Sequence, residues 1–209
     1  MRLSAIMQLT LEQCLGEPLF TPGSEPLILG EPASRAVIVG RFQTIEREVR
    51  LDQAAHWNVP VLRRRTGGGT VVLGPGQIVI GLRMRALDGG PKVITQTALA
   101  PVIRAITHHL GQTPILCGEG DLTLDGRKIL GSSLKISGGQ AWYLAVLLVE
   151  DASIWMERLL NHPSREPQYR AQRKHSDFCT CLSAHGGTIS VLLPILKDMI
   201  TQDLAEVLI

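Results

Sequence analysis

The amino-acid sequence predicts an α+β fold, in which a mixed or largely antiparallel sheet is flanked by helices. Short aliphatic and β-branched runs, such as Ala36-Val37-Ile38-Val39, alternate with glycine- and proline-rich turns and are typical of strands. Two longer segments, residues 92–110 and 190–208, carry apolar residues at helical spacing with polar residues between them. Together these patterns favour helices that pack their apolar faces on a sheet.

Size and composition fit one globular domain. A chain of 209 residues can bury a substantial core, and its 44% hydrophobic and 19% charged content separates it from disordered chains. The net charge of +2 gives no reason to expect nucleic acid or a membrane as a partner. The sequence has no signal-peptide pattern and no apolar run near the roughly 18 residues that span a bilayer. We therefore expect a single cytoplasmic domain over residues 1–209.

The remaining elements follow in chain order from local patterns. The first part of the chain predicts a short helix at residues 9–15, strands at 27–29 and 36–39, and an amphipathic helix at 44–57. The apolar runs 71–73 and 78–82, on either side of Gly74-Pro75-Gly76, predict a strand pair or one strand broken by a bulge. Proline should kink or divide the helix at 92–110, since Pro101 lies inside it. A strand at 141–149 and a helix at 153–160 precede the last helix, where Pro194 fits only in the first turn.

The stretch Arg63-Arg64-Arg65-Thr66-Gly67-Gly68-Gly69-Thr70-Val71 joins three cations to three glycines between two predicted strands. Consecutive glycines lose packing and backbone entropy, so they are kept where φ is positive or a ligand approaches the backbone. Exposed N–H groups in such a loop form an anion site, and arginine can bind phosphate or carboxylate beside it. The alternative is a simple glycine turn whose arginines point into water. The two common phosphate-loop patterns are absent.

A second informative stretch is the predicted hairpin around Asp125-Gly126. A two-residue loop there pairs Thr123 with Lys128, Leu122 with Ile129 and Asp121 with Leu130. Because side chains alternate along a strand, Asp121, Thr123 and Lys128 should share one face. The small residues Gly131-Ser132-Ser133 would then let a ligand approach the strand. The alternative is that Lys128 is an ordinary solvated lysine.

These two stretches together resemble the superfamily of lipoate-protein ligase A, octanoyltransferases and biotin-protein ligases. The Arg-Arg-x-Ser-Gly-Gly-Gly motif of that family is similar to residues 63–69, and its Lys-x-x-Gly-Ser motif is similar to residues 128–132. Residues 39–43, Val-Gly-Arg-Phe-Gln, followed by Glu48, also resemble the family. The resemblance runs from about residue 36 to residue 149.

The resemblance implies a biotin/lipoate-protein ligase-like catalytic domain that uses ATP and Mg²⁺. Lipoic acid would be activated as lipoyl-adenylate and passed to a lysine of a lipoyl carrier domain. Lys128 would be the catalytic residue, and Asp121 would lie near the nucleotide and Mg²⁺. The residues implied to bind substrate or nucleotide are Arg64, Thr66, Gly67, Gly68, Gly69, Thr70, Val71, Gly74, Gly76, Gln77, Asp121, Gly131, Ser132 and Ser133. The C-terminal accessory domain of the long ligases does not fit within this length, which raises a separate accessory subunit as a further partner.

The sequence also departs from the family pattern. Gly120 replaces an asparagine, Leu73-Gly74 replaces His-Asp, and Trp142-Tyr143 replaces His-Gly. The turn at residues 74–77 is more similar to that of octanoyltransferases. One alternative is therefore an ATP-independent octanoyl or lipoyl acyltransferase that uses a cysteine thioester, with Cys117, Cys179 and Cys181 as the candidates.

Two further questions stay open at this point. A cofactor-binding or carrier-binding protein could retain the glycine stretch while losing turnover, and the altered positions at Gly120 and Leu73 are what such a protein would show. The polar residues 163–178 are either a solvated loop, a docking or gating segment, or a basic contact for an acidic carrier.

Overall fold

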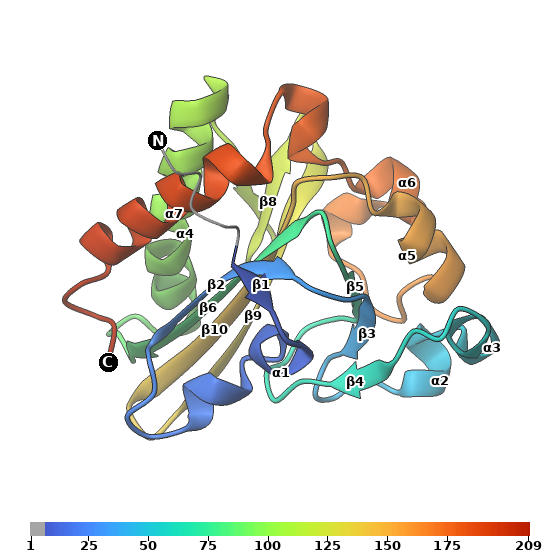
Figure 1. Ribbon diagram of the computed structural model, residues 1–209, viewed down its shortest axis with the longest axis horizontal. Helices are drawn as coiled ribbons and strands as arrows, with labels where there is room; N and C mark the ends of the chain where they lie inside the picture. The colour runs from blue at the N-terminus through green and yellow to red at the C-terminus, as the bar shows by residue number, and fades with distance from the viewer. Residues whose placement is uncertain (1–6) are drawn as a thin grey trace.

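Two β-sheets form the framework of the computed structural model, which describes residues 7–209 (Figure 1). The larger sheet has the strand order β1-β2-β6-β10-β9-β8-β7 and is antiparallel except for the β1–β2 pair. The smaller sheet has the order β4-β3-β5, with β3 parallel to β4 and antiparallel to β5. The strands are β1 Gln8–Leu9, β2 Leu27–Pro32, β3 Ala36–Val39, β4 Val61–Arg63, β5 Val71–Leu73, β6 Gln77–Arg85, β7 Ile115–Cys117, β8 Asp121–Leu124, β9 Arg127–Ser137 and β10 Gln140–Leu148. The predicted mixed and largely antiparallel sheet is confirmed.

Helices cover the sheets on different sides (Figure 1). α4 and α7 pack against each other and against the larger sheet, whereas α5 and α6 pack beside the smaller sheet. The α-helices are α1 Leu11–Cys14, α2 Ile45–Glu48, α3 Leu51–His56, α4 Gly90–Leu110, α5 Ser153–Leu159, α6 His175–Phe178 and α7 Ile189–Asp203. Short 3-10 helices lie at Glu17–Phe20, Gln168–Arg170 and Leu182–His185. Among residues 7–209, no helix combines the length and the apolar character needed to cross a membrane.

Side-chain alternation along β6 separates the two faces of the larger sheet. Ile80 and Leu82 join the buried cluster under α4 and α7. Val79 points the other way, into a cluster with Ile38 and Leu73 of the smaller sheet. The sheets therefore pack through this second cluster, and the connection between β4 and β5 is brought against β9.

The structure divides residues 44–57, predicted as one helix, into α2 and α3. Between them the Arg50 N–H donates to the Leu159 carbonyl at 2.9 Å, and Val49 forms a β-bridge with Leu160. These backbone groups are bonded to the last residue of α5 and to the residue after it, so they cannot continue a helix. The single-helix prediction was wrong because local periodicity does not reveal a competing partner distant in sequence.

The strands on either side of the Gly74-Pro75-Gly76 turn are also arranged differently from the prediction. β5 pairs with β3 in the smaller sheet, whereas β6 lies between β2 and β10 in the larger one. The two strands do not pair with each other, so the turn transfers the chain from one sheet to the next. Two short apolar runs joined by a turn have the same sequence pattern whether the two strands pair with each other or enter different sheets.

Both helical prolines are accommodated inside single helices. α4 continues through Pro101 instead of dividing there, and Pro194 lies in the second turn of α7 instead of the first. Proline at 194 deprives the Ser190 carbonyl of its helical partner. Ser190 is exposed, so water can bond to that carbonyl.

Candidate active site

The connection between β4 and β5, residues 64–70, is hereafter the glycine loop, and it is shaped by the buried side chain of Arg64. The Arg64 guanidinium donates to the Gly67 carbonyl at 2.6 and 3.1 Å, to the Gly69 carbonyl at 2.7 Å and to the Ile38 carbonyl at 3.3 Å. Burial lowers the pKa of Arg64 to about 10, so it remains a cation at neutral pH. In this structure the donors of Arg64 go to the loop and to β3, and its role in substrate binding stays a prediction.

The three glycines of the loop have different surroundings. Gly68 has a φ of +85°, and a Cβ there would lie 3.0 Å from Arg64 Nη2, so a side chain is excluded by both conformation and space. A Cβ at Gly67 or Gly69 would meet no atom within 4 Å. These two glycines therefore border open space from which a ligand can reach the backbone.

Two threonines frame the loop. Thr66 is fully buried, and its hydroxyl lies 2.8 Å from the hydroxyl of Ser133 on β9, which holds the loop against the larger sheet. The hydroxyl of Thr70 is buried and has no hydrogen-bond partner within the described part of the chain. A buried hydroxyl without a partner is costly, so a ligand that bonded to it would relieve that cost.

The predicted hairpin brings Lys128 and Asp121 together. Lys128 Nζ lies 2.8 Å from Asp121 Oδ1, and both side chains are largely shielded from solvent. A Cβ at Gly131 would lie 2.6 Å from Lys128 Nζ, so glycine at this position leaves room for the ammonium group. Lys128 is thus a paired lysine at the edge of the site, and not a freely solvated one.

The hairpin register contains a bulge that the sequence did not reveal. Thr123 pairs with Lys128 as predicted, but Leu122 pairs with Leu130 instead of Ile129. The predicted pairs Leu122–Ile129 and Asp121–Leu130 are wrong because the extra residue shifts the strand. Thr123 is buried, and its hydroxyl donates to the Ile115 carbonyl on β7 at 3.3 Å, so it does not join the ion pair.

The replacement of the family asparagine by Gly120 has a local steric explanation. Ser132 Oγ donates to the Gly120 carbonyl at 2.7 Å, and a side chain at position 120 would collide with this hydroxyl. The predicted site residue Ser132 therefore binds the backbone next to Asp121. This contact fixes the start of β8 and with it the Asp121 carboxylate.

The turn between β5 and β6 forms its own set of contacts. Gln77 is buried, its amide donates to the Val72 carbonyl at 3.1 Å, and it accepts from the Gly74 N–H at 3.3 Å. The Gly76 N–H donates to Glu31 Oε1 at 2.7 Å. These bonds hold the turn in shape, and the role of Gly74, Gly76 and Gln77 in ligand binding stays a prediction.

Sequence reasoning missed Tyr169, which belongs to residues 161–178, hereafter the overlying segment. The Tyr169 hydroxyl donates to Asp121 Oδ2 at 2.7 Å, so both carboxylate oxygens of Asp121 are bonded. Burial and the neighbouring Asp121 charge raise the pKa of Tyr169, which keeps the phenol protonated as a donor. Its ring packs against Phe178 with centroids 5.2 Å apart, and Lys128 Nζ lies 6.0 Å from the Phe178 centroid. No local pattern could identify Tyr169, because its partner lies in a strand distant in sequence.

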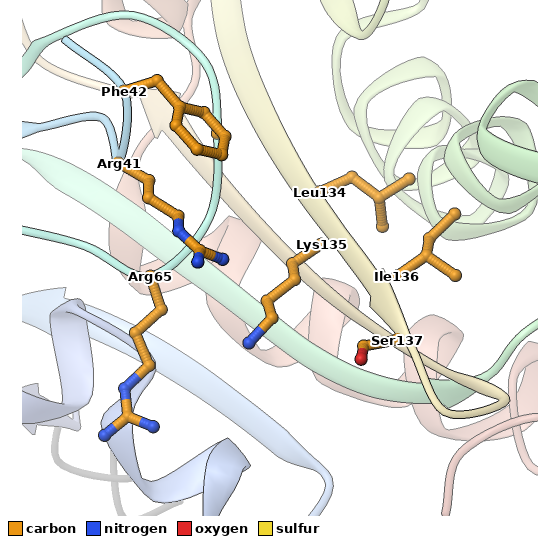
Figure 2. Close-up of a pocket in the computed structure, with 8 residues that line it drawn as sticks. Arg41, Phe42, Arg65, Leu134, Lys135, Ile136 and Ser137 are labelled. Atoms are coloured by element: carbon orange, nitrogen blue, oxygen red, sulfur yellow. The ribbon is translucent and has the colours of Figure 1, made fainter.

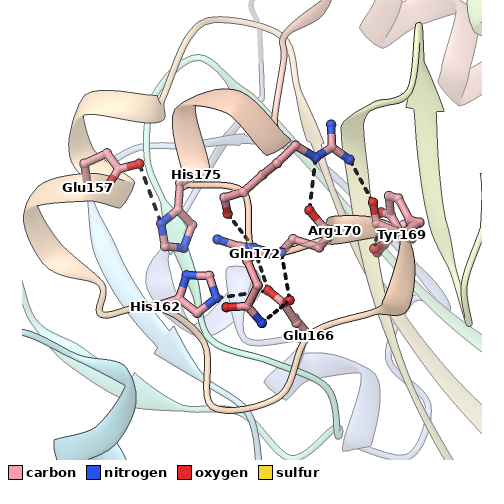
Figure 3. A network of polar contacts seen from close by, with 9 residues as sticks. Glu157, His162, Glu166, Tyr169, Arg170, Gln172 and His175 are labelled. Carbon is pink, nitrogen blue, oxygen red and sulfur yellow. Dashed lines mark hydrogen bonds and ion pairs between the residues drawn. The ribbon is translucent and has the colours of Figure 1, made fainter.

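A polar network centred on Glu166 shapes the overlying segment (Figure 3). Glu166 accepts from the N–H and side-chain amide of Gln172 at 3.0 and 2.8 Å, and it contacts His162 at 3.0 Å and Arg170 at 3.4 Å. His175 lies 3.9 Å from Glu157, and burial together with Arg170 lowers its pKa to about 4. The segment is therefore held together by its own side-chain contacts, while its role as a solvated loop, a docking or gating segment, or a basic contact for an acidic carrier stays a prediction.

The cysteines are free thiols, and one of them lies beside the catalytic candidate. Cys179 forms a parallel β-bridge with Lys128, and the N–H of Thr180 donates to the Lys128 carbonyl at 2.9 Å. Burial raises the pKa of the Cys179 thiol despite the nearby Lys128 charge. Cys181 is also buried, and Cys117 is half-buried with its sulfur 3.4 Å from the Thr123 hydroxyl.

The chain is similar in sequence to proteins of one family. Residues 4–206 match the family model of the lipoyl protein ligase A/B catalytic domain. The chain is 32% identical to a lipoate–protein ligase of Streptococcus pyogenes over 131 residues, which are 62% of this chain and 38% of that relative. It is 28% identical to the mitochondrial lipoyl amidotransferase of Homo sapiens over 141 residues, 66% of this chain and 37% of that relative. The chain therefore spans well under half the length of these curated relatives.

Solved structures of low sequence identity share the fold. A lipoate-protein ligase A bound with ATP gives a TM-score of 0.79 at 19% identity, covering 96% of this chain and 84% of the other. A structure from the bipartite lipoate protein ligase and E2 lipoyl domain of Thermoplasma acidophilum gives a TM-score of 0.79 at 20% identity, covering 96% and 82%. With the family model extending over almost the whole sequence, the chain belongs to the lipoyl protein ligase A/B catalytic domain family.

Proposed function

We propose that this protein activates lipoate with ATP as lipoyl-adenylate and transfers the lipoyl group to a lysine of a lipoyl carrier domain. The observation that carries the proposal is the 2.8 Å ion pair between Lys128 and Asp121, because Lys128 lies on β9, the strand whose Ser133 is hydrogen-bonded to Thr66 of the glycine loop. A fixed cation beside a loop with open backbone positions suits a reaction in which negative charge develops on phosphate and carbonyl oxygens. Relatives described as lipoate-protein ligases, and a similar fold solved with ATP, support this assignment.

Each group would have a distinct task. The carbonyls of Gly67 and Gly69 are bound by Arg64, which leaves the loop amides and the open side of the loop for the adenylate phosphate and the acyl group. Lys128 would stabilise the negative charge on the acyl carbonyl and phosphate in both steps. The hydroxyl of Thr70 would donate to the bound intermediate.

Magnesium would depend mainly on the nucleotide for its ligands. Within residues 7–209 no group of three or more carboxylate, histidine or thiol ligands is present. Asp121 fits as a single carboxylate ligand, because Mg²⁺ is commonly held by one or two carboxylates together with substrate phosphates and water. When bound, the ion would offset phosphate charge. Asp121 would have to exchange its bond to Lys128 or Tyr169 for this contact.

The surroundings of Cys179 support the adenylate route over a thioester route. A cysteine nucleophile reacts as the thiolate, and burial that raises the thiol pKa disfavours that form. Lys128 lies next to Cys179, yet its charge does not overcome the effect of burial. An ATP-dependent reaction needs no thiolate at this position.

The intact mass of a purified lipoyl carrier domain tests the proposal. The domain is incubated with this protein, lipoate and magnesium, with and without ATP. A gain of one lipoyl group only with ATP is expected. Transfer from an octanoyl-carrier thioester without ATP, lost on replacing a cysteine, would instead establish the acyltransferase. If both reactions fail, adding a separate accessory subunit distinguishes an incomplete ligase from a carrier-binding protein without turnover.

A further inference from the structure

Two tryptophans lie side by side on the surface formed by α3 and α5, two helices at the same edge of the molecule (Figure 1). Trp57 directly follows α3, Trp155 belongs to α5, and their ring centroids are 5.6 Å apart in an edge-to-face arrangement. The Arg158 guanidinium lies 4.9 Å from the Trp57 centroid and 5.3 Å from that of Trp155. We call these three residues, with Leu51 of α3 and Ile154 of α5, the tryptophan surface.

The apolar part of the tryptophan surface is open to solvent. Trp57 is 41% exposed, Leu51 is 43% exposed and Ile154 is 53% exposed. Large apolar side chains cost free energy when water covers them, and monomeric proteins rarely gather several of them in one exposed patch. This patch therefore indicates a surface that another protein covers.

Other exposed apolar side chains have a different explanation. Phe42 and Ile136 line the pocket of about 320 Å³ next to Gly67, so they belong to the candidate active site (Figure 2). Ile115 on β7 and Val191 on α7 are exposed, but each is the single large exposed apolar residue of its strand or helix. Isolated apolar side chains of this kind are normal on protein surfaces and do not indicate a partner.

The two rings are fixed before a partner binds. The Arg35 guanidinium lies 3.9 Å from the centroid of the Trp155 ring, which also contacts Trp57. α3 is joined to α5 because the Arg50 N–H donates to the Leu159 carbonyl at 2.9 Å. Tryptophan and arginine often dominate the binding energy of an interface, and rigid side chains lose little entropy on binding. The tryptophan surface thus has the composition and the rigidity of a binding hot spot.

Charged residues on and around the tryptophan surface carry both signs: the positive residues are Arg35, Arg50 and Arg158, and the negative residues are Asp52 and Asp151. Within residues 7–209 none of these five side chains forms an ion pair. A nearly balanced set of charges gives no strong field that would select a uniformly acidic or basic partner. Such a surface is instead complementary to a second copy of itself, because arginines on one copy can face carboxylates on the other.

The small size of the tryptophan surface limits the strength of the contact. α3 has six residues and α5 has seven, so each helix is about 10 Å long. Two adjacent helices of that length, each about 10 Å wide, present far less than the roughly 800 Å² that a standard interface covers on each partner. We therefore expect a reversible complex with a Kd in the micromolar range, and not an obligate dimer.

We propose that two copies of this protein associate through the tryptophan surface. Identical chains most often assemble as dimers with two-fold symmetry, in which the same patch on each copy contacts its counterpart. The exposed side chains of Leu51, Trp57 and Ile154 would be buried in that contact. The inference goes beyond the proposed function and does not depend on it, because no residue of the tryptophan surface is assigned to lipoate, nucleotide or Mg²⁺.

Analytical ultracentrifugation of the full chain at concentrations from about 1 to about 200 μM tests the proposal. Ile154→Asp is compared with Val191→Asp as the matched control. Both substitutions replace an exposed β-branched residue in the first turn of a helix, α5 or α7, where a carboxylate suits the helix dipole. Trp57→Ala is a second interface variant, and circular dichroism checks that each variant is folded. Amide hydrogen exchange at low and high protein concentration locates the contact.

The parent protein and Val191→Asp should dimerise with the same Kd. Ile154→Asp and Trp57→Ala should each raise that Kd about hundredfold, because a loss of about tenfold per copy occurs twice in a two-fold contact. Hydrogen exchange should slow in α3 and α5 as the concentration rises. A parent protein that stays monomeric over the whole range would overturn the proposal. An unchanged Kd in either interface variant, an equal loss in Val191→Asp, or protection confined to other elements would overturn it as well.

Discussion

The Tyr169 hydroxyl lies 2.7 Å from Asp121 Oδ2, on the opposite carboxylate oxygen from the Lys128 ammonium. Tyr169 comes from the overlying segment, and Asp121 comes from the first residue of β8. The three groups form a chain in which Tyr169 orients Asp121 and Asp121 orients Lys128. A residue with no contact to the reacting atoms can therefore influence where the catalytic charge is placed.

Changing Tyr169 to phenylalanine tests this orientation. The ring would still pack on Phe178, but the bond to Asp121 would be lost. We expect kcat for lipoyl transfer to fall about tenfold, the size of one hydrogen bond to a charged group (about 1.5 kcal/mol), with KM for lipoate little changed. Steady-state kinetics measure both constants.

Thr107→Val is the control, because it removes a hydroxyl that donates to the Ile103 carbonyl within α4 at 2.7 Å and has no contact with Asp121. It should leave kcat unchanged. If Tyr169 acts through Asp121, the double variant Tyr169→Phe/Asp121→Asn should be no slower than Asp121→Asn alone. Additive losses in the double variant would show that Tyr169 acts by another route.

Lys128→Ala should reduce lipoyl transfer by about a hundredfold or more, the effect of losing one preorganised charge at the reacting oxygens. Lys128→Arg should restore little, because the space beside Gly131 suits a compact ammonium group. Transfer is followed by the mass of the carrier domain, with Lys197→Ala as the surface control. Transfer at the parental rate in Lys128→Ala would remove Lys128 from the mechanism.

The glycine loop offers a pair of contrasting substitutions. Gly68→Ala should lower the free energy of unfolding by about 1–2 kcal/mol, because alanine is strained at a φ of +85°. Gly67→Ala meets open space and should leave the fold intact while weakening substrate binding. Chemical denaturation reports the first effect, and KM for ATP and lipoate reports the second. Equal stability of the two variants would contradict the distinction.

Cys179→Ala should retain most of the transfer activity. Removing one small buried side chain costs on the order of 1 kcal/mol of stability, which does not abolish folding. Cys14→Ala, another buried thiol with a pKa raised to about 12, serves as the control. Complete loss of transfer in Cys179→Ala, with Cys14→Ala active and both variants folded, would support a thioester intermediate.

Acid should destabilise the overlying segment through His175. Its pKa is about 4 when folded, against an ordinary value of 6.5, so the unfolded chain binds more protons between these two values. The free energy of unfolding should therefore fall as the pH drops from 6.5 towards 4, by at most about 3 kcal/mol from this group. His175→Gln should flatten the dependence, measured by urea denaturation at several pH values. His108→Gln, at an exposed site on α4, should leave it unchanged.

Local sequence patterns predicted much of the fold and part of the site. The strand at Ala36–Val39, the helix ending at Leu110 and the pairing of Thr123 with Lys128 follow from periodicity and turn chemistry. The bulge after Lys128, the break at Val49 and the separation of β5 from β6 depend on partners elsewhere in the chain. The hydrogen bonds of Arg64 could not be predicted for the same reason. Its position in the sequence indicates a cation near the glycine loop, but does not reveal that its guanidinium donates to the carbonyls of Gly67 and Gly69. Tyr169 was missed for the same reason.

β9 carries Lys128 near one end and Lys135 near the other, and it is bonded to β8 on one side and β10 on the other. β8 pairs with the Lys128 end of the strand and β10 pairs with the remainder, from residue 130 to residue 137, so the strand is anchored along its whole length by two different neighbours. The strand therefore acts as a rigid support for the Lys128 side chain. Movement during the reaction would fall to the glycine loop and the overlying segment, whose contacts to β9 are side-chain bonds that can break and reform.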